Sequence, residues 1–286
     1  MKIAVVGATG MIGSAVTDEL LGRGHHVTGI ARNSDALKLR ESLTRRSANL
    51  FDYDTFAETI RGHDVVICAF SPGHGMGPQV YKGVVEAGWR IKRAFKRAGG
   101  DYLINVGGAS SLWNARGTQM FEVPLWPQWY FNTASPEHLR YLHGVTGAAP
   151  FEALAISRER IRATAGADPH ADWPEQELRN FIAKIAANHD IGEGGRAQLE
   201  LFEHDRSCDW SFVSPPWFLR AGPRTWAYRT QVRELPLEGD VPAGISVADL
   251  AVAIADEAEH RKFVHAHWSA ARDIAVTSRA TISVYR

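Results

Sequence analysis

Short apolar runs alternate with longer amphipathic runs over the first 111 residues of the chain. The apolar runs, each bounded by turn residues, lie at 2–6, 26–31, 48–51, 64–70 and 102–106. The amphipathic segments between them predict helices at 11–21, 34–43, 54–61 and 79–98. Strands that alternate with helices in this way form right-handed βαβ units. We therefore predict an α/β fold with a doubly wound parallel sheet, which binds ligands beyond the carboxyl ends of its strands.

The alternation stops after the fifth apolar run. Residues 112–188 contain no convincing strand, and they predict helices at 135–143, at 151–165 and from 172 onward. We interpret residues 113–190 as a helical, aromatic-rich insertion that forms a lid over the mouth of the sheet. Its aromatic side chains could line a pocket for an apolar or aromatic substrate, or instead form the insertion's own core or a homodimer interface. These aromatic residues are Trp113, Trp126, Trp129, Tyr130, Phe131, Tyr141 and Trp173.

Regular elements return near the C-terminus. The pattern predicts a strand that begins near residue 208, a helix at 247–257 and a last strand at 262–268. We assign residues 215–286 to the substrate side of the fold. Because no linker or internal repeat divides the chain, residues 1–286 are expected to form one domain.

A glycine-punctuated turn separates the first strand from its helix. Gly7 suits a sharp exit from the strand, Gly10 allows a ligand to approach the backbone, and Gly13 allows the helix to lie close to the strand. The following helix N-terminus offers unpaired N–H groups and a positive dipole end. Strand, turn and helix in this order predict a pyrophosphate site of the Rossmann type.

The second strand ends in Ala31-Arg32-Asn33, with a guanidinium where NAD-binding proteins usually carry a carboxylate. A guanidinium offers a bidentate, permanently charged partner for a 2′-phosphate, so Arg32 favours NADP(H) as the cofactor. A solvated arginine at a helix start is the alternative. Asp52 follows the third predicted strand, where either an adenine contact or simple turn chemistry would explain it.

Composition narrows the class of protein. Lys+Arg and Asp+Glu both number 32, so the net charge is zero and no attraction to nucleic acid or an anionic membrane is expected. No apolar run is long enough to span a bilayer. The two cysteines, Cys68 and Cys208, indicate neither a disulfide framework nor a metal site. We expect a cytoplasmic protein without a bound metal.

Several signatures together resemble those of the atypical short-chain dehydrogenases/reductases, in particular the NAD(P)H-binding, NmrA-like group. The similarity covers the chain except for roughly residues 124–187. The signatures are Gly7-Ala8-Thr9-Gly10 with Gly13, Ala31-Arg32-Asn33, Asp52, Gly62-x-Asp64-Val65-Val66, Gly107-Gly108-Ala109-x-Ser111-Leu112, Asp209-Trp210-x-Phe212-Val213-Ser214-Pro215 and Ser246-Val247-x-Asp249-Leu250-Ala251.

The resemblance implies where a dinucleotide would bind. The residues implied to hold its phosphates are Gly7, Thr9, Gly10, Met11, Ile12, Gly13 and Arg32. By the same resemblance, the segment Ala69, Phe70 and Ser71 flanks the adenosine ribose, and Pro215 lies beside the nicotinamide.

The sequence departs from the wider reductase families at one point, because it contains no Tyr-x-x-x-Lys pair. Another group would then supply the proton during catalysis, which is worth about 10²–10⁴-fold in rate. Our candidates are Ser111 and Ser110 on the loop after the fifth strand, Tyr130 in the insertion, and His189, near which the missing tyrosine falls by register. Ser111 is the strongest of these candidates on geometric grounds.

Three functions fit these features. The first is an NADPH-dependent oxidoreductase that transfers hydride to a carbonyl, quinone or enone of an aromatic or polycyclic small molecule. The second is a non-catalytic NADP(H)-sensing regulatory protein, which the missing Tyr/Lys pair allows. The third is an NAD(P)-dependent epimerase or dehydratase, which normally needs the tyrosine base and therefore ranks last.

Overall fold

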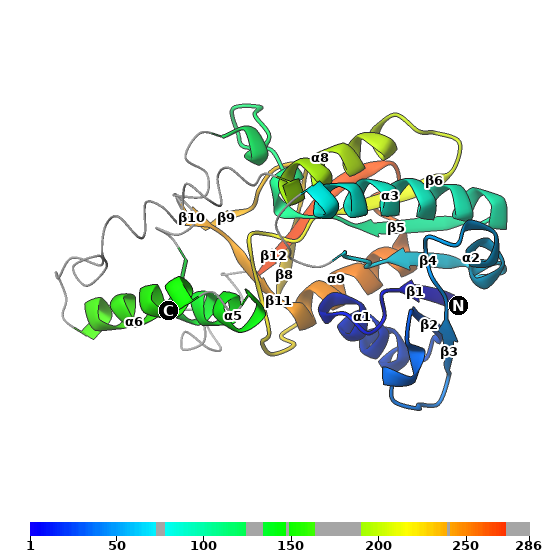
Figure 1. Cartoon of the computed structure of the whole chain (residues 1–286), viewed down its shortest axis with the longest axis horizontal. Helices are drawn as coiled ribbons and strands as arrows, with labels where there is room; N and C mark the ends of the chain where they lie inside the picture. The colour runs from blue at the N-terminus through cyan, green and yellow to red at the C-terminus, as the bar shows by residue number, and fades with distance from the viewer. Residues whose placement is uncertain (73–77, 124–133, 147–148, 164–189, 239–240, 273–286) are drawn as a thin grey trace.

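An eight-stranded sheet forms the centre of the molecule (Figure 1). The computed structural model describes residues 1–72, 78–123, 134–146, 149–163, 190–238 and 241–272. The strands follow the order β3-β2-β1-β4-β5-β6-β12-β8, and only β8 runs antiparallel to its neighbour. Their bounds are β1 Lys2–Val6, β2 His26–Ala31, β3 Leu43–Ser47, β4 Val65–Cys68, β5 Tyr102–Val106, β6 Asp209–Val213, β8 Tyr228–Val232 and β12 Ala266–Arg272. The predicted doubly wound Rossmann sheet is confirmed, and it is parallel except for β8.

Helices cover both faces of this sheet (Figure 1). On one face lie α1 (Met11–Gly22) and α9 (Val247–His260), which pack side by side. On the other face lie α2 (Tyr53–Ile60), α3 (Pro78–Ala98) and α8 (Asp190–Glu203). Since the order of strands reverses between β1 and β4, the crevice at their carboxyl ends is where a fold of this kind binds its ligand.

The sheet separates two hydrophobic cores. Alternate residues of β1 point to opposite faces, so Ile3 and Val5 pack with α1 and α9, whereas Ala4 and Val6 pack with α2, α3 and α8. Every residue of β4 and β5 is buried, as expected for central parallel strands covered on both sides. These buried strands set the carboxyl edge of the sheet firmly in place.

The edge of the sheet differs from the sequence-based prediction. Residues 34–43 do not form the predicted helix. Within this range only Ser34–Ala36 is helical, and it forms a single 3₁₀ turn. The third strand is β3 at Leu43–Ser47 and not residues 48–51. This edge strand is mostly polar and exposed, so it lacks the apolar run that marks the central strands.

The last strand is also displaced from its predicted position at 262–268. The helix α9 ends at His260, and its C-cap residue Arg261 lies in the left-handed region, with φ of 49°. The Glu257 carboxylate then accepts from the backbone N–H groups of Lys262 and Phe263 at 3.0 Å each. This turn delays the start of β12 to Ala266.

The region after β6 contains short strands that the sequence pattern did not reveal. They are β7 Phe218–Arg220, β9 Leu237–Glu238, β10 Val241–Pro242 and β11 Gly244–Ser246. β7 pairs with β11 in parallel, and β9 pairs with β10 in antiparallel fashion. Each is only two or three residues long, which is too short to show a period of two.

The insertion contributes two helices at the end of the molecule toward which the parallel strands run (Figure 1). α5 spans Pro136–Thr146 and α6 spans Ala149–Ala163, which confirms the predicted helices at 135–143 and 151–165. Arg220 of β7 donates to the Ser135 hydroxyl at 3.0 Å and so ties this pair to the C-terminal region. The third predicted helix, from residue 172, lies outside the described residues.

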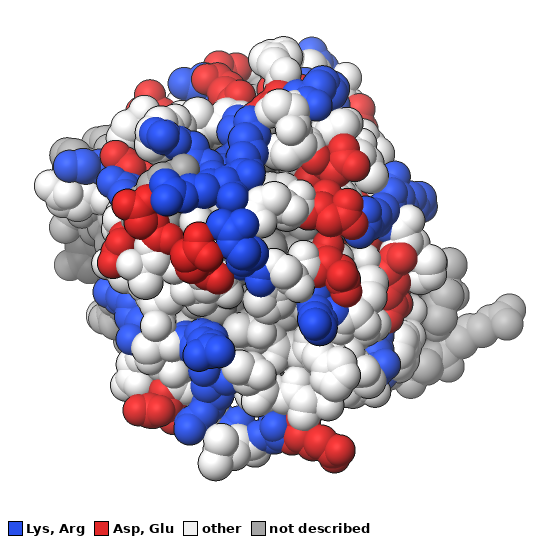
Figure 2. Space-filling model, turned by 90° about the vertical axis from the view of Figure 1, so that its right-hand side faces the viewer, with Lys and Arg blue, Asp and Glu red and all other residues white. Residues whose placement is uncertain are grey.

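Basic and acidic side chains are mixed across the face at the amino-terminal end of the strands (Figure 2). Ion pairs at this end join Arg97 to Asp54 at 2.7 Å and Arg61 to Glu58 at 2.8 Å. These two arginines therefore have acidic neighbours. Separately, none of the helices in the described ranges combines the length and apolar character needed to cross a bilayer.

Candidate functional site

The glycine turn after β1 has the geometry that its sequence predicts. Gly7 adopts φ of +80°, and a Cβ there would lie 2.7 Å from the Ala69 carbonyl oxygen. A Cβ on Gly13 would lie 2.1 Å from the Gly7 oxygen, far inside any permitted contact. Both positions therefore require glycine, the first for its backbone angle and the second for the close packing of helix on strand.

The N-terminus of α1 is open to an anion. The N-cap residue is Gly10, which has no side chain that could bond the first N–H groups of the helix, and no acidic residue occupies the first turn. Thr9, Gly10 and Met11 are exposed, whereas Gly13 is buried. The positive end of the helix dipole and the exposed backbone thus fit a diphosphate, which is what the fold requires of a dinucleotide site.

Arg32 lies beside this turn, at the carboxyl end of β2. The Gly7 amide donates to the Ile30 carbonyl at 2.9 Å, which brings the turn against the end of the strand. The Arg32 side chain is exposed and makes no ion pair with the described residues. The first carboxylate after the strand, Asp35, lies 3.8 Å from Arg45. Arg32 is therefore available to a ligand at this edge.

A second arginine at the same edge was missed in the sequence. Arg46 of β3 pairs in register with Ile30 of β2, one residue before the end of each strand. It is exposed and, within the described part of the chain, has no ion-pair partner. Because the sequence pattern placed the third strand at 48–51, Arg46 appeared to lie in a loop before the sheet.

The segment after β4 borders the glycine turn from the other side. The Ala69 amide donates to the Val6 carbonyl at 2.9 Å, and Phe70 packs edge-on against Phe51 with ring centroids 5.8 Å apart. Ser71 is exposed. Asp52 precedes α2 as its N-cap residue but makes no side-chain capping bond, so its exposed carboxylate is not used to cap the helix.

The two serines after β5 differ in their surroundings. Ser111 is fully buried, and its hydroxyl donates to the Gly108 carbonyl at 2.7 Å. It also lies 3.0 Å from the Ser214 hydroxyl, which in turn lies 2.9 Å from His267 Nε2. Ser110 is only partly buried, and its hydroxyl makes a longer bond of 3.3 Å to the Gly192 carbonyl. Ser110 is thus the more accessible hydroxyl of the pair.

The remaining candidates from the sequence are Pro215, Tyr130 and His189. Pro215 is buried directly after β6, next in sequence to Ser214 and at the same edge of the sheet as the loop after β5. Tyr130 and His189 lie outside the described residues. Ser214 and His267 were missed as site residues, because the contact between them joins positions 53 residues apart and no local pattern marks it.

Burial lowers the pKa of His267 from about 6.5 to about 3, with a smaller contribution from nearby Arg233. Its ring therefore stays neutral in the folded protein at pH values where the unfolded chain takes up a proton. Stability should fall as the pH is lowered through about 6.5, by up to about 1.4 kcal/mol per pH unit. Urea unfolding at pH 7 and pH 5 should show a drop that is about 2 kcal/mol larger for the wild type than for His267→Gln. An equal drop in both would contradict a neutral buried ring.

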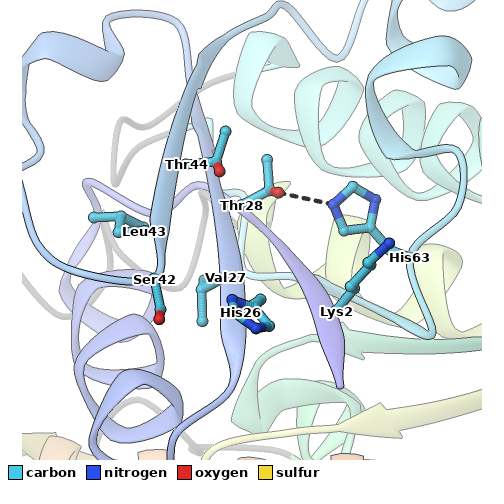
Figure 3. Close-up of a pocket in the computed structure, with 8 residues that line it drawn as sticks. All are labelled: Lys2, His26, Val27, Thr28, Ser42, Leu43, Thr44 and His63. Atoms are coloured by element: carbon cyan, nitrogen blue, oxygen red, sulfur yellow. Dashed lines mark hydrogen bonds between the residues drawn. The ribbon is translucent and has the colours of Figure 1, made fainter.

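Two surface pockets lie away from the dinucleotide turn. One, of about 320 Å³, lies at the amino-terminal ends of β1, β2 and β3, where His63 Nε2 bonds the Thr28 hydroxyl at 2.8 Å (Figure 3). The other, of about 370 Å³, lies beside His267 and the end of α8. Within the described ranges, no group of three or more His, Cys, Asp or Glu residues could hold a metal ion. The first pocket lies at the opposite edge of the sheet from the glycine turn, where the sequence predicts a dinucleotide site.

Comparisons with known proteins agree with this geometry. Residues 7–129 match the family described as NAD(P)H-binding. YwnB, an uncharacterised protein of Bacillus subtilis, is 28% identical over 266 residues, which span 91% of this chain and 93% of that protein.

Solved structures share the fold over nearly the whole chain. A proposed epimerase from Bacteroides thetaiotaomicron superimposes with a TM-score of 0.66 at 24% identity, over 95% of this chain and 97% of that one. A proposed NADH-flavin reductase from Streptococcus pneumoniae gives 0.64 at 20% identity, over 96% and 100%. Residues 7–129 therefore match an NAD(P)H-binding family, and the chain as a whole has the Rossmann fold of these solved structures.

Proposed function

We propose that the protein is an NADPH-dependent reductase that transfers hydride to a carbonyl, quinone or enone of an aromatic or polycyclic small molecule. The observation that carries the choice of cofactor is the pair Arg32 and Arg46. Both are exposed at the carboxyl end of β2 and β3, and neither has an acidic partner in the described ranges. Two free guanidiniums beside the glycine turn are suited to a 2′-phosphate and serve no purpose for NADH.

The aromatic character of the acceptor follows from the insertion. Its helices α5 and α6 lie at the end of the fold toward which the parallel strands run, where the nicotinamide half of a dinucleotide would reach (Figure 1). The insertion is rich in tryptophan and tyrosine, and aromatic side chains bind flat, apolar ligands well. A substrate with an aromatic or polycyclic body fits this composition best.

A bound reduced nicotinamide would supply two electrons and one hydrogen as hydride. The chain's own residues would hold the diphosphate at Gly7–Gly13 and the 2′-phosphate at Arg32. Among the candidate proton donors, we propose that Ser110 contacts the acceptor oxygen, since this residue is only partly buried and its hydroxyl makes a long bond of 3.3 Å to the Gly192 carbonyl. Ser111 is not the donor in this proposal, because its hydroxyl already donates its proton to the Gly108 carbonyl. It would instead hold the turn that carries Ser110.

This proposal is tested by following NADPH absorbance at 340 nm with a panel of quinones, aromatic ketones, aromatic enones and oxidised flavins. Flavins are included because the S. pneumoniae neighbour is described as a proposed NADH-flavin reductase. We expect turnover with at least one acceptor and a preference for NADPH over NADH. Cofactor binding by calorimetry without oxidation by any acceptor would reject the reductase and favour the NADP(H)-sensing alternative, which the absence of a Tyr-x-x-x-Lys pair allows.

A further inference from the structure

Three buried polar side chains from distant parts of the sequence form a line of hydrogen bonds under the turn after β5. Ser111 bonds the Gly108 carbonyl at 2.7 Å, Ser214 lies 3.0 Å from Ser111, and His267 Nε2 lies 2.9 Å from Ser214. Ser111 and Ser214 are fully buried, and His267 is 3% exposed. Since buried polar groups are costly unless paired, this line is a specific feature of the fold.

The direction of the line is fixed by what each group can donate. The Gly108 carbonyl can only accept, so it takes the single hydroxyl proton of Ser111. Ser111 must then accept from Ser214, and Ser214 in turn must accept from His267. This requires the Nε2–H tautomer of the imidazole. The other ring nitrogen, Nδ1, is buried without a hydrogen-bond partner in the described structure, which agrees with a bare lone pair there.

The strands β6 and β12 also hold the turn through packing, by way of Phe212 and His267. A Cβ on Gly107 would lie 2.2 Å from the Phe212 ring, so this ring presses directly on the turn backbone. The His267 ring meets Phe212 edge-on, with centroids 5.5 Å apart. In contrast, apart from its chain neighbours, no described residue has an atom within 4 Å of where a Cβ on Gly108 would be, so the described part of the chain leaves that side of the turn open. The turn is therefore held on the side of Gly107, where it meets Phe212, and it can meet a ligand on the side of Gly108.

We propose that His267 is a positioning residue, which acts through Ser214 and Ser111 to fix the Gly107–Ser110 turn that faces the acceptor. This inference rests on the proposed reductase function and adds a residue from the last strand to it. The Ser111 hydroxyl holds the Gly108 carbonyl inward, and this sets the backbone that presents Ser110. Small errors in the position of such a group lower the rate of chemistry more than they lower binding.

The groups around His267 belong to several elements. The surface pocket beside its ring is also lined by Glu203 and His204 at the end of α8, Arg206, Arg233 and His265. Glu203 lies 3.6 Å from Arg233, so these two charges face each other. None of these residues bonds Ser214 or Ser111 in the described structure, which leaves His267 as the residue at the start of the line.

The test compares variants that keep or remove the donor. His267→Phe keeps a ring against Phe212 but loses the N–H, whereas His267→Gln keeps an N–H that can reach Ser214. We expect His267→Phe and Ser214→Ala to lower kcat at least about tenfold with little change in the KM for NADPH, and His267→Gln to stay near the wild type. Ser269→Ala is the matched control, because Ser269 is a buried hydroxyl on the same strand without a hydrogen-bond partner in the described structure.

Two further measurements separate the possible outcomes. If His267 acts through Ser214, the double variant His267→Phe/Ser214→Ala should lose no more activity than either single variant. Losses that add up in the double variant would overturn the proposal. In ¹⁵N-labelled protein, the amide signals of residues 108–111 should shift in His267→Phe and Ser214→Ala but not in Ser269→Ala. Unshifted signals would reject the positioning role even if no acceptor were reduced, so failure of the reductase proposal and failure of this one can be distinguished.

Discussion

Replacing Gly13 by alanine is expected to destabilise the fold by about 3 kcal/mol and to weaken NADPH binding by roughly a hundredfold. The added Cβ would lie 2.1 Å from the Gly7 carbonyl oxygen and 2.7 Å from its carbon, so the helix cannot keep its place on the strand. Moving α1 outward would displace the turn at which we propose that the diphosphate binds. Urea unfolding and titration calorimetry with NADPH measure the two effects.

Gly22→Ala provides the control on the same helix. Gly22 ends α1, and outside the adjoining helix no described residue has an atom within 4 Å of its Cβ position. Alanine there should leave NADPH binding unchanged and keep or slightly raise stability, since glycine in a helix costs roughly 0.5–1 kcal/mol relative to alanine. If Gly13→Ala bound NADPH as tightly as Gly22→Ala, the close contact with Gly7 would not be what shapes the site.

The centre of the fold could be predicted from the sequence because its signals are local. The strand at 2–6, the glycine turn and the strand at 26–31 are consecutive, and the strand at 102–106 has the predicted bounds. Buried parallel strands must be apolar along their whole length. The turn that leads from such a strand into the N-terminus of a ligand-binding helix must be built from small residues. The glycine turn can therefore be recognised within the first thirteen residues of the chain.

The margins of the site could not be predicted in the same way. The edge strand β3 reads Leu43-Thr44-Arg45-Arg46-Ser47, and its pairing with β2 stabilises it without an apolar face. An element held mainly by backbone pairing leaves little trace in a hydrophobicity pattern. As a result Arg46 was overlooked, although it lies on the strand next to the one that ends at Arg32.

The buried line that ends at His267 shows a second kind of limit. Ser111 was recognised from its loop, but Ser214 and His267 reach it only because β5, β6 and β12 are neighbours in the sheet. The sequence around residue 267 suggests an ordinary strand with a histidine. Tertiary hydrogen bonds between strands that are far apart in the chain require the sheet order, and periodicity does not supply it.

Arg32→Asp is expected to weaken NADPH binding by about 10–150-fold or more, because a hydrogen bond between charged groups contributes about 1.5–3 kcal/mol and the new carboxylate repels the 2′-phosphate. NADH carries no such phosphate, so its affinity should change by less than about threefold. Arg46→Gln should cause a smaller loss of the same kind. Titration calorimetry with both cofactors gives the ratio directly.

Arg61→Gln is the matched control for this prediction. Arg61 is also exposed, but it follows α2 at the amino-terminal edge of the sheet and pairs with Glu58 at 2.8 Å. Its loss should alter neither affinity, because the opposite edge of the sheet cannot reach a dinucleotide at the glycine turn. A selective loss of NADPH binding in Arg32→Asp but not in Arg61→Gln would establish that the guanidinium at the end of β2 recognises the phosphate. Equal losses for NADPH and NADH would show instead that Arg32 supports a part common to both, and the choice of NADPH would have to be abandoned.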